Sequence, residues 1–568
     1  MFVETVRIES LSNNSYVVGS EQSGRCIVID PARDVDQYVQ IAASHGTRIV
    51  YAFETHVHND FVSGARELAD QTGCQVGASA SGGLLFPSVR LQEGDEFDLG
   101  EFQVRVIHTP GHTPESVSLL IEEQGQPKMV FTGGALLLGG AARVDLLGSK
   151  VAPFLARWLH NTIHKKLLKL PDAVEVYPTH GGGSFCSAAP GGGEIPSTIA
   201  HERLTNPFAA EAEETNFVKF ALTGLGSYPS YYKYMADINR RGPDILGGVP
   251  RLASLTALSV RNHLDNEAVL IDARPEREFN LGHVPDSFAI PHGNAMATWV
   301  GWVVPWGQPL VLLSADAGQH DDMMRQLIRI GFDRVHGFLS GGIDAWKSAG
   351  LPIEESKRLA LDELKQAQDL PAAPMVIDVR QRSEYDMGHI SGALNIELGE
   401  LQEHLDGLPR ELPLEAVCAA GMRATTAGSI LQRDGRDNVQ VVDEAGHRPG
   451  SSGATPRRPA GSRRLFRHSG EGRNPGRSDW RVLDDLGRAI ALTLAISRAR
   501  EREKESLSGH WTNKFDPVSP GLARLGTSGP MALPEYFAAT GVLLRPACRP
   551  RPVPCRPRTR LYGRRTPR

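Results

Sequence analysis

The stretch Thr55-His-Val-His-Asn-Asp-Phe-Val-Ser-Gly64 decides how the first part of the chain folds. It follows residues 49–53, an apolar run of strand length, so His56 and His58 are expected just beyond the end of a buried strand. Two imidazoles at positions i and i+2 of a loop can bind one cation. The sequence therefore predicts a metal site at this strand end.

Two more histidines follow apolar runs in the same way. His112 lies in Thr109-Pro-Gly-His-Thr after residues 102–107, and His180 lies in Tyr177-Pro-Thr-His-Gly. A single histidine of this kind is most simply a hydrogen-bonded loop residue, but several at Gly/Pro-rich strand ends indicate ligands gathered along one edge of a sheet. The candidate metal ligands are His56, His58, Asp60, His112 and His180.

These motifs, in this order, resemble the metallo-β-lactamase superfamily, together with Gly94-Asp-Glu-Phe-Asp-Leu-Gly and Phe131-Thr-Gly. The resemblance implies a four-layer αββα fold over residues 1–240. Dinuclear hydrolases of the superfamily carry a histidine where this chain has Phe61, and an aspartate that bridges the metals where it has Gly134. The two changes remove ligands of a second metal and disfavour hydrolysis by a bridging hydroxide.

Composition sets broad limits on the function. The 568 residues suggest several domains, and 40% apolar with 22% charged residues is typical of a soluble globular protein. The sequence has no apolar run of the roughly eighteen residues that a membrane span requires, and a net charge of -5 argues against a nucleic-acid surface. Six dispersed cysteines form no paired framework, so a cytoplasmic location is expected.

A Gly/Pro-rich linker is predicted at residues 241–251, followed by an internal repeat. Ile271-Asp-Ala-Arg-Pro-Glu-Arg-Glu-Phe-Asn-Leu-Gly-His recurs as Ile377-Asp-Val-Arg-Gln-Arg-Ser-Glu-Tyr-Asp-Met-Gly-His, with a constant offset of 106 (377 − 271). Both copies resemble rhodanese domains, which are small α/β sulfurtransferases with a parallel sheet. The predicted boundaries are 252–356 and 357–446, and the shared acidic and basic residues of the repeat are interpreted as architectural.

The second copy contains the loop Cys418-Ala-Ala-Gly-Met-Arg423 between an apolar segment and a helical run. Backbone N–H groups of such a loop, at a helix N-terminus, form an anion cradle that stabilises a thiolate. Cys418 is therefore the predicted nucleophile, with Arg423 as its cationic partner. In the first copy Ala315 and His320 stand at these positions, so that copy is predicted to be inactive.

The domain order resembles bacterial persulfide dioxygenase–rhodanese fusions. That resemblance implies one Fe(II) per chain, held by two histidines and an aspartate, which oxidises a low-molecular-weight persulfide such as glutathione persulfide with O2, giving sulfite and the thiol. Cys418 would move sulfane sulfur between thiosulfate and thiols. His56 and His112 match the family's histidines, whereas Gly134 stands at the carboxylate position.

The missing carboxylate leaves several ligand sets open. The candidates to replace it are His58, Asp60, Asp145 and His180, with Asp145 more simply a structural loop residue. A three-histidine site from His56, His58 and His112 would suit Zn(II) as well as Fe(II). Cys186, close to the predicted metal edge, is interpreted as an inert thiol.

Two other functions remain as alternatives. One is a zinc-dependent hydrolase of glutathione thioesters, similar to glyoxalase II. The other is a degenerate, non-catalytic sulfur-trafficking protein, because residues 447–568 are rich in Arg, Pro and Gly and lack the final helix that a second rhodanese requires. We interpret this tail as the product of a shifted reading frame, and its rival interpretation is a basic segment for an acidic partner. Homo-oligomerisation is left open.

Overall fold

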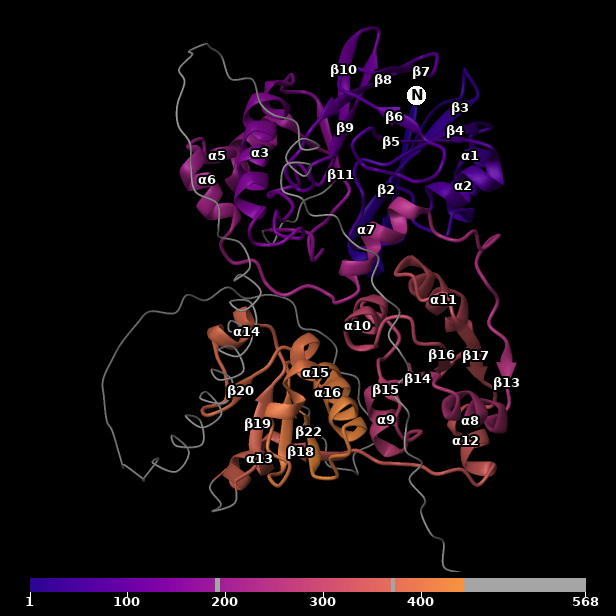
Figure 1. Ribbon diagram of the computed structural model, residues 1–568, viewed down its shortest axis with the longest axis vertical. Coiled ribbons are helices and arrows are strands. Elements are labelled where there is room, and N and C mark those ends of the chain that lie inside the picture. Colours follow the sequence, from indigo (N-terminus) through magenta and orange to yellow (C-terminus); the bar gives the residue numbers. More distant parts are fainter. Residues whose placement is uncertain (189–194, 369–372, 444–568) are drawn as a thin grey trace, which may run out of the picture. The chain divides into compact units, whose positions relative to one another are not determined.

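The computed structural model describes residues 1–188, 195–368 and 373–443 (Figure 1). The predicted Arg/Pro/Gly-rich tail, residues 447–568, lies outside the described residues, as does any helix that would close the second rhodanese-like unit. Among the described helices, none has the length and apolar character needed to cross a membrane.

The N-terminal part is built from two six-stranded sheets. The first sheet keeps its strands in chain order: β1 (Phe2–Ile8), β2 (Asn13–Ser20), β3 (Arg25–Ile29), β4 (Arg48–Phe53), β5 (Gln75–Ser79) and β6 (Val89–Leu91). The second sheet reads β12 (Ser197–Thr198), β11 (Glu175–Pro178), β10 (Gln126–Gly133), β9 (Val117–Glu123), β8 (Gln103–His108) and β7 (Glu96–Asp98). The predicted apolar runs at residues 49–53 and 102–107 form β4 and β8, and the apolar residues before His180 form β11.

Side chains from both sheets meet in a shared core, in which Tyr16, Phe53 and Phe131 are almost completely buried. Helices cover the outer faces. On the first sheet lie α1 (Asp36–Ser44) and α2 (Ala65–Thr72), and on the second lie α3 (Ala152–Lys165), α4 (Ile199–Thr205), α5 (Pro207–Ala210) and α6 (Glu214–Ala221). The predicted αββα arrangement is therefore confirmed. A further helix, α7 (Tyr232–Arg241), follows these layers.

Residues 254–348 and 357–443 contain two five-stranded parallel sheets with the same strand order. The first is β13 (Ser254–Leu255), β17 (Val335–Leu339), β16 (Leu310–Leu313), β14 (Val269–Asp272) and β15 (Phe288–Ala289). The second is β18 (Lys357–Ala360), β22 (Val439–Asp443), β21 (Leu414–Val417), β19 (Met375–Asp378) and β20 (Leu394–Asn395). Strand for strand, the two sheets confirm the internal repeat.

Helices flank these parallel sheets, as the mainly apolar and buried central strands β14, β16, β19 and β21 require. The first unit has α8 (Ala257–Asp265), α9 (Glu276–Leu281), α10 (Met296–Val303), α11 (His320–Arg329) and α12 (Gly342–Ser348). The second has α13 (Leu361–Gln368), α14 (Arg382–Met387), α15 (Leu401–His404) and α16 (Met422–Arg433). Short 3-10 helices lie at η1 (Glu9–Leu11), η2 (Leu167–Lys169), η3 (Ala317–Gln319), η4 (Leu398–Glu400) and η5 (Leu405–Gly407).

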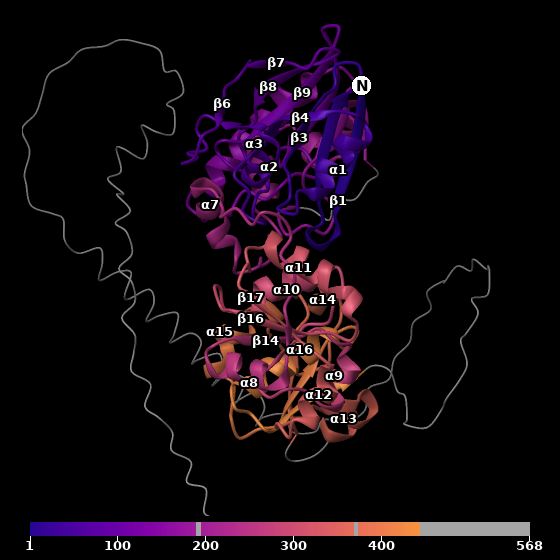
Figure 2. The same ribbon diagram turned by 90° about the vertical axis from the view of Figure 1, so that its right-hand side faces the viewer.

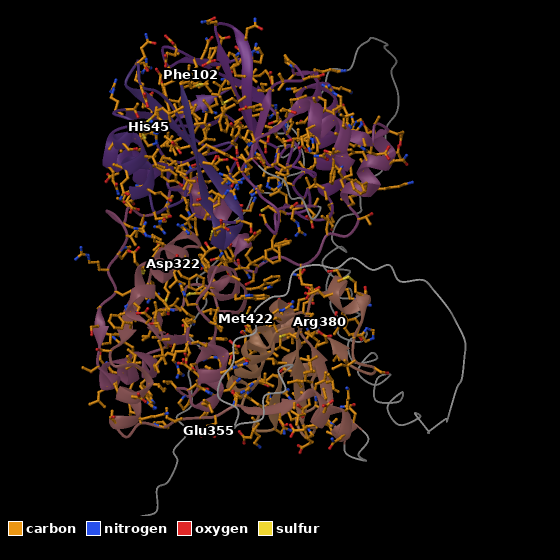
Figure 3. All side chains as sticks on the ribbon, turned by 180° about the vertical axis from the view of Figure 1, so that it is seen from behind. His45, Phe102, Asp322, Glu355, Arg380 and Met422 are labelled. Atoms are coloured by element: carbon orange, nitrogen blue, oxygen red, sulfur yellow. The ribbon has the colours of Figure 1, made fainter. Side chains whose placement is uncertain are left out.

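In the first unit, α10 and α11 pack side by side, and α8 packs beside α12 (Figures 1 and 2). Trp346 of α12 is fully buried, and its indole N–H donates to the Pro352 carbonyl at 2.8 Å. The first unit therefore ends in a helix that buries an aromatic residue. Arg380 and Met422, labelled in Figure 3, mark the chain just after β19 and the start of α16, where the loops at the carboxyl ends of the strands lie.

Candidate functional site

Four histidines lie at the ends of strands in the N-terminal sheets. His56 and His58 follow β4, His112 follows β8, and His180 follows β11. All four are buried, with exposed fractions of 3% or less. The strands end at the same edge of the sandwich, so the structure brings together histidines that are up to 124 positions apart in sequence.

The Nε2 atoms of His56 and His180 face each other, and the His112 ring lies beside both of these imidazoles. Each of their Nδ1 atoms has a partner: Thr55 Oγ1 at 2.9 Å for His56, the Arg143 carbonyl at 2.7 Å for His112, and Asn13 Oδ1 at 3.1 Å for His180. Such contacts fix the orientation of metal-binding imidazoles. The second nitrogen of each ring, Nε2, is left for a ligand.

The distances between the rings fit a shared cation. The Nε2 atoms of His56 and His180 are 3.3 Å apart, and the His112 ring centroid lies 4.9 Å and 5.3 Å from those two rings. Two imidazole nitrogens bound at roughly 2.1 Å to one tetrahedral ion lie about 3.4 Å apart. Among the described residues His112 Nε2 has no hydrogen-bond partner although it is buried. A buried nitrogen of this kind is costly unless something binds it.

Electrostatics keep two of these imidazoles neutral. Burial lowers the pKa of His56 well below its usual value, and the nearby histidines lower it further. Burial, followed by the charge of His180, lowers the pKa of His112 to about 3. A neutral imidazole has a free lone pair, which a metal ligand requires.

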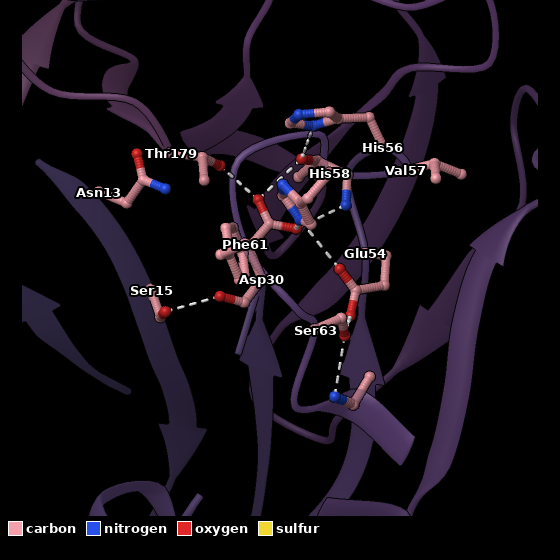
Figure 4. A network of polar contacts seen from close by, with 12 residues as sticks. Asn13, Ser15, Asp30, Glu54, His56, Val57, His58, Phe61, Ser63 and Thr179 are labelled. Atoms are coloured by element: carbon pink, nitrogen blue, oxygen red, sulfur yellow. Dashed lines mark hydrogen bonds and ion pairs between the residues drawn. The ribbon is translucent and has the colours of Figure 1, made fainter. Parts of the chain in front are cut away.

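His58 differs from the other three. Its Nε2 lies 3.0 Å from Glu54 and 3.2 Å from Asp30, and both carboxylates are buried (Figure 4). Burial lowers its pKa, but these two carboxylates outweigh burial and raise the pKa to about 10. Asp30 also accepts hydrogen bonds from Thr55 N–H and Thr179 Oγ1. His58 also belongs to a group of possible metal donors with His56 and His180, but its Nε2 contacts the two carboxylates of an ionic cluster.

Asp60 lies behind His180, on the side away from Nε2. Its Oδ2 accepts from Asn13 Nδ2 at 2.6 Å and lies 3.4 Å from His180 Nδ1. Burial raises its pKa, but the charge of His180 outweighs burial and holds the pKa well below its usual range. The Tyr231 hydroxyl donates to the Asp60 carbonyl at 2.6 Å. This geometry suits a carboxylate that orients His180, which is a different role from the direct ligation that the sequence suggested.

Neither Phe61 nor Gly134 offers a donor atom. The Phe61 ring lies 4.2 Å from the His58 ring. A Cβ added to Gly134 would lie 2.5 Å from Cδ2 of His112, so the His112 ring fills the space that a side chain at position 134 would need. Asp145 is bound by Arg143 at 2.7 Å and 2.8 Å, as expected for a structural loop carboxylate.

Sequence reasoning placed one thiol, Cys186, near the metal edge but did not name it as a candidate ligand. Cys186 is fully buried, and its sulfur belongs to a group with donor atoms of His112 and His180 that all lie within 4.8 Å of one another. The sequence placed Cys186 six residues after His180 in a glycine-rich segment, which gave the only hint. The approach of its side chain to the histidines depends on how that segment folds back.

The second candidate site is the loop between β21 and α16. The Cys418 sulfur accepts hydrogen bonds from the N–H groups of Gly421 at 3.1 Å and Ala424 at 3.3 Å. Gly421 has a φ of 87°, a left-handed conformation that favours glycine. Arg423 binds both oxygens of Glu384, at 2.6 Å and 2.8 Å. The loop therefore has the anion cradle predicted from the sequence, with its arginine held in place by a glutamate.

Comparisons with known proteins agree with this geometry. Residues 9–180 match the metallo-beta-lactamase superfamily, and residues 256–349 and 360–445 match the rhodanese-like domain. The mitochondrial persulfide dioxygenase ETHE1 of Homo sapiens is 30% identical over 195 residues, covering 34% of this chain and 70% of the human protein. A hydroxyacylglutathione hydrolase of Pseudomonas putida is 29% identical over 220 residues, covering 34% of this chain and 81% of that protein.

A solved structure supports the same fold. The metallo-beta-lactamase of Staphylococcus aureus is 26% identical, with a TM-score of 0.53, and the match covers 59% of this chain and 98% of that one. The human relative and the domain matches together show the family. The chain belongs to the persulfide dioxygenase family of the metallo-β-lactamase superfamily, in which it is a fusion with two rhodanese-like domains.

Proposed function

We propose that this chain is a sulfur-metabolism enzyme that oxidises a low-molecular-weight persulfide at the N-terminal metal centre and transfers sulfane sulfur through Cys418. One observation supports it most directly. The Nε2 atoms of His56 and His180 lie 3.3 Å apart beside the buried His112 ring, whose Nε2 has no partner among the described residues, in a chain of the persulfide dioxygenase family that also carries the Cys418 cradle.

The residues that would hold the metal are His56, His112 and His180, with His180 taking a role that the family gives to an aspartate. A bound Fe(II) would supply oxygen activation, and three protein ligands would leave it positions for other molecules. A zinc ion would fit the same nitrogens but would supply no redox chemistry. The Nδ1 contacts of the three rings orient them before any ion binds, and burial keeps bulk water from the site.

The overall reaction balances as follows. Glutathione persulfide, O2 and water give glutathione, sulfite and two protons, so the terminal sulfur is oxidised and O2 takes up its electrons. Glutathione is the proposed carrier because relatives of this chain include a hydroxyacylglutathione hydrolase. The cytoplasm is the proposed location, in keeping with the free thiols at Cys26, Cys74, Cys186 and Cys418.

Sulfur transfer would use the second rhodanese-like unit. The Cys418 thiolate attacks the sulfane sulfur of thiosulfate, the S–S bond of thiosulfate breaks, and sulfite leaves with the bonding pair. The resulting Cys418 persulfide then gives its outer sulfur to an acceptor thiolate. The N–H groups of Gly421 and Ala424 stabilise the negative sulfur before and after transfer.

The test is metal analysis of protein purified without oxygen, combined with O2 uptake in the presence of glutathione persulfide. We expect one iron per chain and persulfide-dependent uptake that yields sulfite. Zinc with hydrolysis of a glutathione thioester and no O2 uptake would replace the proposal with the hydrolase. No bound metal and no turnover at either site would favour the degenerate, non-catalytic protein.

A further inference from the structure

Gly134 and Cys186 are connected through one short backbone segment, residues 141–143. The N–H of Ala142 donates to the Gly134 carbonyl at 3.1 Å, and the N–H of Arg143 donates to the Cys186 carbonyl at 2.7 Å. Ala188 N–H closes the pairing by donating to Ala141 at 3.0 Å. Residues 141–143 therefore lie between the position that lost its carboxylate and the segment that carries the thiol.

The same segment holds His112. The Arg143 carbonyl contacts His112 Nδ1 at 2.7 Å, so His112 and Cys186 are both fixed to residue 143, one through its carbonyl and the other through its N–H. The His112 Nε2 atom is buried and has no partner among the described residues. Its possible co-donors include the Cys186 sulfur and an imidazole nitrogen of His180, all within 4.8 Å of one another.

We infer that Cys186 is a metal ligand that completes a His56, His112, His180 and Cys186 set in place of the carboxylate missing at Gly134. The site would take a divalent ion that accepts sulfur, such as Fe(II) or Zn(II), in preference to Mg(II) or Mn(II). The inference rests on the metal centre of the proposed function. On an ion with six positions the four donors leave two free, so persulfide oxidation remains chemically open.

The surroundings of the thiol control when it ionises. Burial raises the pKa of Cys186 well above its usual value, and the Asp60 carboxylate adds to this effect, whereas the charge of Arg143 opposes it. Tyr232 also hydrogen bonds with the sulfur. Without an ion the residue is a neutral thiol, and binding of a divalent cation would displace its proton.

The test uses the full-length chain, stripped of metal and loaded anaerobically with Co(II), which reports thiolate ligation through a near-ultraviolet sulfur-to-cobalt charge-transfer band. Wild type should bind one Co(II) per chain and show the band. Cys186→Ser should lose the band and bind Co(II) at least about tenfold more weakly. The matched controls are Cys26→Ser, a buried thiol of β3, and Cys418→Ser, and both should keep the band.

Two further measurements separate the possible failures. The thermal unfolding of Cys186→Ser, compared with that of wild type, reports whether the variant has folded, and Cys186→Asp should keep the ion while losing the band. Cobalt bound to wild type without the band, or a band that survives Cys186→Ser, overturns the assignment of Cys186 and leaves the histidine centre in place. Failure of wild type to bind any cobalt overturns both the inference and the proposed metal centre.

Discussion

The two rhodanese-like units share their framework and differ in one loop. Arg274 binds both oxygens of Asp272, and Arg380 binds both oxygens of Asp378 with nearly the same distances. Each arginine also donates to the glycine carbonyl that ends the next helix. In each unit a histidine stacks on the aromatic residue four positions earlier. These repeated contacts support an architectural role for the shared motif.

The loop after the central strand separates the two units. In the second unit the N–H of Gly421 donates to the Cys418 sulfur, whereas in the first the N–H of Gly318 donates to the Asp316 carboxylate at 2.9 Å. His320, which stands in place of the arginine, hydrogen bonds with Ser314 at 2.8 Å. In both units a glycine N–H of this loop donates to a side chain a few residues earlier. The side chain that accepts this hydrogen bond decides whether the site has a nucleophile.

The largest expected effect comes from the nucleophile. Cys418→Ser should lower thiosulfate:cyanide sulfur transfer by roughly a thousandfold or more, because the covalent route depends on the thiolate. Adding Ala315→Cys to that variant should not restore activity, because Asp316 already occupies the N–H of Gly318. The measurement is steady-state thiocyanate formation. Activity that survives Cys418→Ser would show that the second loop does not owe its activity to the Cys418 nucleophile. Recovery of activity in the double variant would show that Asp316 does not block the first loop.

A smaller effect concerns pH and the buried histidine of the first unit. Burial lowers the pKa of His283 to about 4, and the charge of Arg274 adds to this. The unfolded chain takes up the proton at a higher pH, near 6.5, so stability is complete above that pH and falls as pH decreases toward 4. The loss should reach about 3 kcal/mol.

Hydrogen exchange of β14 and β15, compared between wild type and His283→Gln at each pH, measures this loss. The protection that wild type has over the variant should shrink between pH 7 and pH 4.5. His389, the exposed counterpart in the second unit, supplies the control through His389→Gln. If the protection lost in His283→Gln and in His389→Gln depended on pH in the same way, burial would not be the reason for the pH dependence.

The smallest effect concerns the arginine of the active loop. Arg423→Ala should raise KM for thiosulfate about tenfold, which corresponds to one charge-assisted contact of about 1.4 kcal/mol, with a smaller change in kcat. The variant also leaves the Glu384 carboxylate unpaired near the cradle. Glu278→Gln, at the position of the first unit that matches Glu384, should leave both constants unchanged. An unchanged KM in Arg423→Ala would remove Arg423 from substrate binding.

Much of the architecture could be predicted because its signals are local or periodic. The alternation of apolar strands and helices, the repeat at an offset of 106 and the absence of Cys and Arg from the first loop are all properties of short stretches. The same holds for the histidines, because each one follows an apolar run of strand length in the sequence. Each of these signals depends on residues that are neighbours in the chain.

The composition of the metal centre could not be predicted in the same way. Asp60 stands in the motif as a candidate ligand, yet it contacts the Nδ1 side of His180 because Asn13, from the start of β2, binds its carboxylate. His58 looks equivalent to His56 until Asp30 and Glu54 are found beside its Nε2. The choice between a ligand and an orienting group depends on which ring nitrogen a distant partner occupies.

The sequence by itself determined the order of the domains, the absence of the Cys and Arg pair from the first rhodanese-like loop and the loss of the carboxylate at Gly134. The tertiary structure decided which donor atoms converge, and it alone brought Cys186 toward His112. The physical reason is that a side chain's direction is set by backbone pairing across the fold. Here the pairing of residues 186–188 with residues 141–143 turns a thiol that looks inert in the sequence toward the histidines.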